Sequence, residues 1–257
     1  MKRGLIVYNI IDKEKNSWFI DRLLGELNNE SFSLTYLDEN LLLDYVSSNK
    51  VDYVIYRGRN YHLLESLAHQ GIKTYNSVLT NKIANDKLLT AFFLKENDIK
   101  GVPTYQDASS LSFPYIKKSR SGHGGAEVYL INKQEEDKPV KEAIYQPYLE
   151  NEGDARIYIL NHQVIGAVKR SNSKDFRSNF SLGGDVSLFD ADDFIKETAI
   201  KISRLLNATY IGVDFLLTKN GPLVNEIEDP VGSRMLYQVS DIDIIKLFAN
   251  YIKEDLS

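Results

Sequence analysis

Along the first eighty residues, short apolar runs alternate with segments whose apolar residues recur at helical spacing. Four runs have the length and composition of buried strands: Leu5–Tyr8, Ser33–Leu37, Val51–Tyr56 and Ile72–Tyr75. Two segments between them, Ser17–Leu27 and Leu63–Ala68, predict helices. Alternation of this kind predicts a small, mostly parallel sheet covered by helices.

The pattern changes in the second part of the chain. Asn81 to Asn97 predicts one longer helix, which ends before Gly101-Val102-Pro103. Further elements are predicted as strands at Phe113–Lys118, Val128–Ile131, Arg156–Leu160, Val164–Val168, Tyr210–Leu217 and Leu223–Ile227, and as helices at Ala191–Leu206 and Ile242–Ile252. This later part is therefore expected to be α+β, with antiparallel hairpins around Asn161-His162 and Asn220-Gly221.

Composition narrows the classes of protein. The 257 residues are 43% hydrophobic and 26% charged, as in ordinary globular proteins. The chain has no cysteine, which excludes disulfides, thiolate nucleophiles and cysteine-based zinc sites and fits a cytoplasmic location. The net charge of −5 argues against general nucleic-acid binding. No apolar stretch predicts a signal peptide or a membrane span, so no membrane partner is expected.

A glycine-rich segment separates two of the predicted strands. Lys117-Lys118 ends the first strand, and Ser121-Gly122-His123-Gly124-Gly125 precedes the second. Glycines let backbone N–H groups approach phosphate oxygens, and a lysine offsets phosphate charge. Alternate strand residues point to opposite faces, so only one of the two lysines faces such a ligand. A flexible hairpin turn is an equally good interpretation of this segment alone.

The last predicted hairpin carries three carboxylates, Asp214, Glu226 and Glu228, among apolar residues. Buried carboxylates need a partner, and Mg²⁺ prefers carboxylate and phosphate oxygens. A two-residue Asn220-Gly221 turn would place Asp214 opposite Ile227. A three-residue turn that includes Lys219 would place Asp214 opposite Glu226, so the metal hypothesis predicts the three-residue turn. Salt-bridged or solvated carboxylates are the alternative.

Cations gather in one stretch of this acidic chain, at Lys169, Arg170, Lys174 and Arg177, followed by Asn179. Cations that converge on a phosphoryl group stabilise the charge that develops during its transfer. A solvated loop is the usual alternative for such a run. Arg57 and Arg59 follow a predicted strand at the carboxyl end, where open α/β sheets bind ligands. Either is a candidate for a substrate carboxylate, as is Arg234, although a surface loop is the favoured interpretation.

Taken in order, these segments resemble the ATP-grasp superfamily, specifically its RimK-like carboxylate–amine ligases. The resemblance runs from about residue 76 to the end and is carried by Asn85-Asp86-Lys87-Leu88-Leu89, Phe113–Val128, Gln146-Pro147-Tyr148-Leu149, Asp154-Ala155-Arg156, Lys169-Arg170, Asp175–Asn179, Gly183-Gly184, Gly212-Val213-Asp214, Gly221–Ile227 and Gly232. It implies an ATP-grasp fold in which an N-terminal pre-ATP-grasp parallel-sheet lobe (1–80) precedes two α+β lobes (81–145 and 146–257) that clasp ATP.

The resemblance also implies a role for individual residues. Lys87 and Lys118 would contact ATP phosphates, and Arg170 and Arg177 would face the transferring phosphoryl group. The segment from Gln146 to Leu149 would meet adenine, with Tyr148 and Leu149 as walls, and Asp154 would hold the ribose. The implied metal ligands for two Mg²⁺ ions, or Mn²⁺, are Asp214, Glu226, Glu228 and Asn179.

The implied reaction is ATP-dependent amide formation through an acyl phosphate, between a small-molecule or peptide carboxylate and an amine. Three departures from the family pattern are visible. Glu228 stands where the family usually has Asn, Pro147 stands where the hinge usually carries an acid, and Pro230-Val231-Gly232 stands where the family usually has a Ser-Pro-Gly-like run. Glu228 and Pro147 leave open a nucleotide-binding regulator without ligase activity, and a phosphotransferase is a third interpretation. Homo-oligomerisation is also left open.

Overall fold

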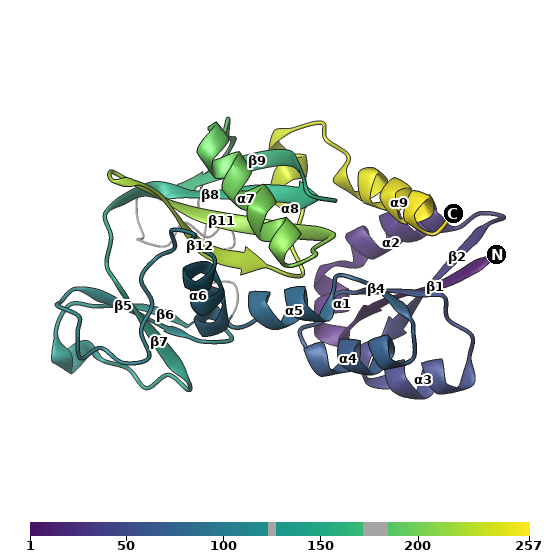
Figure 1. The fold of residues 1–257 in the computed structure, drawn as a ribbon, viewed down its shortest axis with the longest axis horizontal. Helices are drawn as coiled ribbons and strands as arrows, with labels where there is room; N and C mark the ends of the chain where they lie inside the picture. Colours follow the sequence, from purple (N-terminus) through teal and green to yellow (C-terminus); the bar gives the residue numbers. More distant parts are fainter. Residues whose placement is uncertain (123–126, 172–184) are drawn as a thin grey trace.

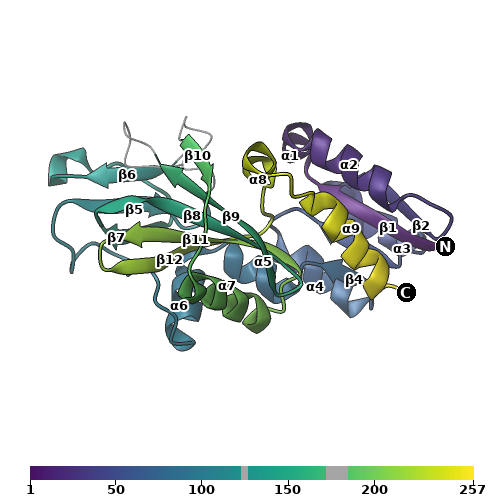
Figure 2. The same cartoon turned by 90° about the horizontal axis from the view of Figure 1, so that it is seen from above.

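We describe a computed structural model of the chain, which places residues 1–122, 127–171 and 185–257. The molecule is elongated, and three sheets follow one another along it (Figures 1 and 2). The N-terminal sheet lies at one end, a five-stranded sheet follows, and a three-stranded sheet lies at the other end. Both chain termini lie at the end formed by the N-terminal sheet (Figure 1).

The N-terminal sheet is parallel, with the order β2-β1-β3-β4. Its strands are β1 (Lys2–Tyr8), β2 (Phe32–Asp38), β3 (Tyr53–Tyr56) and β4 (Lys73–Tyr75). The connecting helical segments are α1 (Ile10–Lys15), α2 (Ser17–Leu27), η1 (Glu39–Leu41), α3 (Leu42–Ser48) and α4 (Tyr61–His69). The predicted alternation of strands and helices is confirmed. It arises because apolar side chains on both faces of β1 and β3 need helices to cover them.

The two faces of this sheet are covered by different parts of the chain. Leu5, Val7 and Val54 pack against α3 and α4. Ile6 and Ile55 on the other face join a core that contains α2 and the C-terminal helix α9 (Ile244–Asp255). The end of the chain therefore completes the lobe formed by its beginning, as α2 and α9 lying side by side show in Figure 1.

The five-stranded sheet is antiparallel, with the order β10-β9-β8-β11-β12. Its strands are β8 (Asn151–Leu160), β9 (Gln163–Ser171), β10 (Asp185–Leu188), β11 (Tyr210–Thr218) and β12 (Gly221–Glu228). One face packs against α7 (Asp193–Leu205) through residues such as Ile157 and Val213. The opposite face is divided: Tyr158 and Tyr210 pack toward the N-terminal lobe, whereas charged residues occupy the remainder.

The three-stranded sheet has the order β6-β5-β7 and is antiparallel. It comprises β5 (Tyr115–Ser119), β6 (Val128–Ile131) and β7 (Ala143–Pro147), with a short 3-10 turn η2 (Gln134–Glu136). The chain passes from β7 directly into β8, so residues 148–150 connect the two antiparallel sheets. The remaining helix α8 (Arg234–Val239) follows β12.

The single helix predicted from Asn81 to Asn97 is wrong. The structure has two helices, α5 (Val78–Ala84) and α6 (Lys87–Glu96), which are separated by Asn85 and Asp86. Asp86 has extended backbone angles, and its carboxylate accepts hydrogen bonds from the N–H groups of Leu88 and Leu89, both at 3.0 Å. An aspartate in this position caps the start of a new helix, because it satisfies donors that lack helical partners.

Candidate functional site

The β11–β12 hairpin places Asp214 directly opposite Glu226, but not by the predicted route. The turn contains two residues, because Thr218 pairs with Gly221, so the predicted three-residue turn is wrong. The register is instead changed by a bulge. Phe215 pairs with Val224 and Asp214 pairs with Glu226, which leaves Asn225 as the extra residue. Without this bulge, Glu226 would point to the face covered by α7.

Cations and carboxylates alternate across the strands that form the charged part of the five-stranded sheet. Arg170 on β9 lies opposite Asp154 on β8, and Arg156 on β8 lies opposite Asp214 on β11. Arg170 and Arg156 both contact the carboxylate of Asp214. All four side chains are buried. Their charges are therefore compensated by one another, as burial requires.

Asp214 is the centre of this network. Its two carboxylate oxygens each accept a hydrogen bond from Arg156 at 2.7 Å, and Oδ2 also accepts one from Arg170 at 2.7 Å. Burial alone would raise the pKa of Asp214, but the two guanidinium groups outweigh it and hold the pKa below its usual value. Asp154 differs: burial and the charge of Asp214 outweigh Arg170 and raise its pKa to about 6.

Lys118 on β5 connects the two antiparallel sheets. Its Nζ lies 2.9 Å from Oε1 of Glu226 and 3.4 Å from Oδ1 of Asn225. Burial lowers the pKa of Lys118, with Glu226 acting in the opposite direction. Lys117 points to the other face of the same strand, where its Nζ contacts Asp137 at 2.6 Å. Lys118 is therefore the lysine that faces the charged sheet.

Lys87, the first residue of α6, approaches the same carboxylate from the other side. Its Nζ lies 4.0 Å from Oε1 of Glu226 and donates to the backbone oxygen of Gly122 at the start of the glycine-rich segment. Burial of Glu226 would raise its pKa, but Lys118 and Lys87 outweigh this effect and lower the pKa to about 2. Glu226 is thus a carboxylate fixed between two lysines, with a side chain that is 26% exposed.

A cleft with an apolar part, which we call the apolar cleft, lies between the two antiparallel sheets. Its lining combines aliphatic, proline and aromatic side chains with a nearly equal number of polar ones: Val102, Ile116, Val128, Pro147, Tyr148, Leu149, Leu216, Lys118, Gln146, Asn151, Asp154, Asn225 and Glu226. Most of the residues that the family resemblance assigned to nucleotide binding line this cleft. Gln146 is buried there, and its Nε2 donates to Thr104 at 2.9 Å. A flat aromatic base fits such walls better than a polar ligand does.

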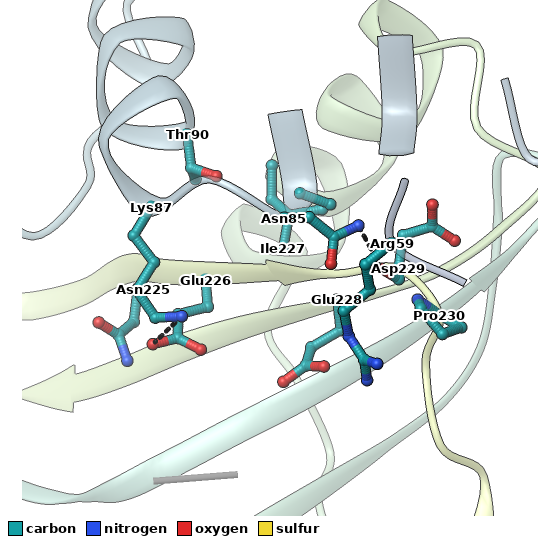
Figure 3. Close-up of a pocket in the computed structure, with 11 residues that line it drawn as sticks. Arg59, Asn85, Lys87, Thr90, Asn225, Glu226, Ile227, Glu228, Asp229 and Pro230 are labelled. Atoms are coloured by element: carbon teal, nitrogen blue, oxygen red, sulfur yellow. Dashed lines mark hydrogen bonds and ion pairs between the residues drawn. The ribbon is translucent and has the colours of Figure 1, made fainter. Parts of the chain in front are cut away.

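A second, mostly polar pocket shares Asn225 and Glu226 with the apolar cleft. We call it the polar pocket, and Figure 3 shows the side chains that line it. In this view Lys87 lies on one side of Glu226 and Glu228, and Arg59 lies on the other side (Figure 3). Since the two cavities share two residues, a ligand in the apolar cleft can place one end at the border of the polar pocket.

Glu228 lies on the same face of β12 as Glu226, and its Oε1 accepts a hydrogen bond from Arg156 at 2.6 Å. Gly212 is directly opposite Glu228 on β11. A Cβ atom at Gly212 would lie 2.8 Å from Val231 and 3.3 Å from Arg156, so a side chain would displace the groups beside Asp214.

Among the described residues, no three His, Asp or Glu side chains are close enough together to form a metal centre. The three carboxylates are instead paired with cations: Asp214 with Arg156 and Arg170, Glu228 with Arg156, and Glu226 with Lys118 and Lys87.

The other predicted residues have different outcomes. Arg177 and Asn179 lie outside the described residues, as does His123 of the glycine-rich segment. Arg57 is buried and lies against the aromatic rings of Phe19 and Tyr210, and it donates to the backbone oxygen of Val231 at 2.6 Å. It therefore joins the lobes, and the surface loop favoured for it is wrong. Arg59 lines the polar pocket, and Arg234 begins α8 as an exposed residue.

Sequence reasoning missed two residues of the site. Arg156 was noticed only as part of a motif, although an arginine two residues after Asp154 on an apolar strand shares its face and indicates a buried charge network. Asn225 lines both cavities because it is the bulged residue. No local signal in the sequence identifies it, since a bulge depends on how two strands pair.

Comparison with known proteins agrees with this geometry. In structure, the chain is similar to the D-alanine–D-alanine ligase of Bacillus anthracis, with a TM-score of 0.75 over all of both chains at 14% identity. The fold is therefore an ATP-grasp fold, and the class of protein is an ATP-grasp ligase. In the part of the chain that the structure describes, no helix is long and apolar enough to cross a membrane.

Residues 60–252 match the RimK-like ATP-grasp domain, and the chain belongs to this family of carboxylate–amine ligases. It is 34% identical to the uncharacterized protein MG011 of Mycoplasma genitalium, over 98% of this chain and 92% of that protein. It is also 28% identical to the coenzyme gamma-F420-2:alpha-L-glutamate ligase of Methanocaldococcus jannaschii, over 76% of each.

Proposed function

We propose that the protein joins a carboxylate to an amine through an acyl phosphate, with release of ADP and phosphate. The observation that carries this proposal is the Lys118–Glu226 contact, where the apolar cleft meets the polar pocket. A nucleotide whose base occupies the cleft would place its terminal phosphate at this border. The reacting groups would then meet on the side of the polar pocket.

The walls of the cleft support a particular placement of ATP. Tyr148 and Leu149 would enclose adenine, and the backbone of residues 146–149 would contact its edge. Pro147 has no N–H, so a neighbouring residue must donate in its place. Asp154 would accept from the ribose hydroxyl groups. Lys118 and Lys87 would donate to the phosphates, with Arg170 near the transferring phosphoryl group.

In the described residues the three carboxylates are paired with cations and form no metal centre of their own. Mg²⁺ is usually held by one or two carboxylates together with phosphate oxygens of the substrate, so these carboxylates would bind the ions jointly with the nucleotide. Asp214, Glu226 and Glu228 would hold the ions, which when bound neutralise phosphate charge and orient the terminal phosphate. A strip of fixed cations alternating with fixed carboxylates is complementary to a magnesium–triphosphate, because that ligand carries both charges. Asn179 is the fourth proposed ligand of the ions, and Arg177 is proposed to face the transferring phosphoryl group.

The proposed chemistry has two transfers. A carboxylate oxygen of the first substrate attacks the terminal phosphorus, and the bond from that phosphorus to the ADP oxygen breaks. The amine nitrogen then attacks the acyl carbon, the C–O bond to phosphate breaks, and the amine loses a proton as the amide forms. Lys118 and Arg170 stabilise the spreading charge, and exclusion of water during the reaction would limit hydrolysis of the acyl phosphate.

The test is a phosphate-release screen in which pairs of candidate acids and amines are supplied with ATP and Mg²⁺. The products are then identified by mass spectrometry. The proposal predicts phosphate release that depends on both substrates, with one amide formed for each phosphate. A stable phosphorylated product without an amide would indicate a phosphotransferase instead. Nucleotide binding without turnover for any pair would indicate a regulatory protein.

A further inference from the structure

Arg59 extends from the segment after β3 into the polar pocket, and one corner of its guanidinium group is fixed. Its Nη1 donates to Oδ2 of Asp12 at 2.7 Å. Asp12 is itself held by Asn9, which donates to the same Oδ2 at 2.9 Å and accepts from the N–H of Asp12 at 2.8 Å. This arrangement caps α1, so Asp12 is a rigid support for the arginine.

Most N–H donors of the Arg59 guanidinium group have no hydrogen-bond acceptor among the described residues. Within residues 1–122, 127–171 and 185–257, Asp12 is its only hydrogen-bonding partner, although the group carries five N–H donors. The side chain is 34% exposed and lines the polar pocket. A guanidinium group fixed at one corner and open along its other edges is suited to a bidentate contact with a carboxylate.

Asn85 supplies a complementary group to the same pocket. Its Nδ2 donates to the backbone oxygens of Asn81 at 2.9 Å and Asp229 at 2.8 Å, so both of its N–H donors are used. Its Oδ1 is thereby left as a hydrogen-bond acceptor on the pocket side, as Figure 3 shows. An oxygen that can only accept favours an N–H group over another carboxylate.

We propose that Arg59, held by Asp12, is the residue that binds the free carboxylate of an amino-acid acceptor and so determines the preference for such acceptors over simple amines. This inference rests on the proposed ligase function and adds to it the residue that recognises the acceptor. The carboxylate lies against Arg59, and the amine lies toward Asn85 and the border with the apolar cleft. The amine is thereby directed to the place where the acyl phosphate forms.

The experiment compares each standard amino acid with its primary amide as acceptor, because the amide keeps the amine and removes the negative charge. For the wild-type protein we expect kcat/KM to favour the acid by roughly 10- to 100-fold, which is typical of a charge-assisted hydrogen-bonded pair. Arg59→Ala should reduce that preference nearly to one, mainly through KM, without changing the affinity for ADP. Arg59→Lys should restore part of the preference because it restores the charge.

Arg22 provides a matched control. It contacts Asp243 at 2.6 Å and is 37% exposed, close to Arg59 in both respects, but it lies on α2 away from the pocket. Arg22→Ala should keep the wild-type preference for acids. The inference is overturned if wild-type protein uses amides as well as acids, or if Arg59→Ala discriminates as well as wild type.

Failure of the proposed function is distinguishable from failure of this inference. If no acceptor gives an amide, the same acids and amides are titrated calorimetrically into protein loaded with ADP and Mg²⁺. Binding of acids that exceeds binding of amides, and that is lost in Arg59→Ala, would keep the carboxylate site while the ligase proposal fails. Absence of any such binding by wild-type protein would reject both.

Discussion

Replacement of Lys118 by Met tests the contact on which the site depends. The Nζ of Lys118 lies 2.9 Å from Oε1 of Glu226, and removing it leaves Lys87, at 4.0 Å, as the nearest cation of that carboxylate. The pKa of Glu226 is about 2 instead of 4.5. At about 1.4 kcal/mol per pKa unit, this shift corresponds to roughly 3 kcal/mol of stability near neutral pH.

The net loss should be smaller than that figure. Lys118 is 4% exposed, and its burial lowers its own pKa despite the nearby carboxylate. The cost of burying the charged lysine therefore offsets part of the stabilisation that Glu226 gains. Methionine also keeps most of the apolar volume. We therefore expect Lys118→Met to reduce the free energy of unfolding by about 1–3 kcal/mol, as for loss of one partner of a partly buried pair.

The pH dependence of stability gives a second measure of the same contact. A carboxylate whose pKa is lower in the folded state stabilises the fold above its unfolded pKa and loses that contribution as pH falls through the folded pKa. For Glu226 the window runs from about 4.5 down to about 2. Chemical denaturation between these values should show a steeper loss of stability for wild-type protein than for Lys118→Met.

Nucleotide binding gives the decisive readout. Loss of a charge-assisted contact to phosphate should weaken ADP binding by roughly 10- to 100-fold in calorimetry. Lys117→Met is the matched control, because it removes a buried lysine and its salt bridge from the opposite face of the same strand. If Lys117→Met weakens ADP binding while Lys118→Met does not, the proposed orientation of the nucleotide is wrong.

Three further outcomes are expected. Gly212→Ala should destabilise the protein by about 1–3 kcal/mol and lower Tm, because its Cβ would lie 2.8 Å from Val231; an unchanged Tm would contradict this close packing. Arg57→Met should lower the free energy of unfolding by about 1–3 kcal/mol, because the backbone oxygen of Val231 loses a buried hydrogen-bond partner. The affinity for ADP should stay at the wild-type value. Weaker ADP binding without loss of stability would indicate that Arg57 belongs to the nucleotide site instead. Removal of Mg²⁺ with EDTA should weaken ADP binding and stop phosphate release, and turnover that persists in EDTA would reject the proposed metal ligands.

The sequence by itself determined most of the elements and the family. The limits of α2 and β6 agree with the predicted ranges, because strong hydrophobic periodicity leaves little choice in such segments. The motifs also identified Lys118, Asp154, Asp214 and Glu226, residues that the fold brings to the two connected cavities or to the charge network beside them. Local periodicity is sufficient for the elements because burial acts over a few neighbouring residues, whereas Lys118 and Asp154 were assigned through the family resemblance.

Only the tertiary structure decided how these residues meet. The bulge at Asn225 sets the register of Glu226, and it depends on pairing between β11 and β12. The break at Asn85 and Asp86 involves Arg120, which contacts the capping carboxylate of Asp86 from a distant part of the sequence. Likewise, Arg57 is buried in the contact between lobes whereas Arg59 lines the polar pocket, although only one glycine separates the two residues. Such choices are made by contacts between distant segments, and no local pattern encodes them.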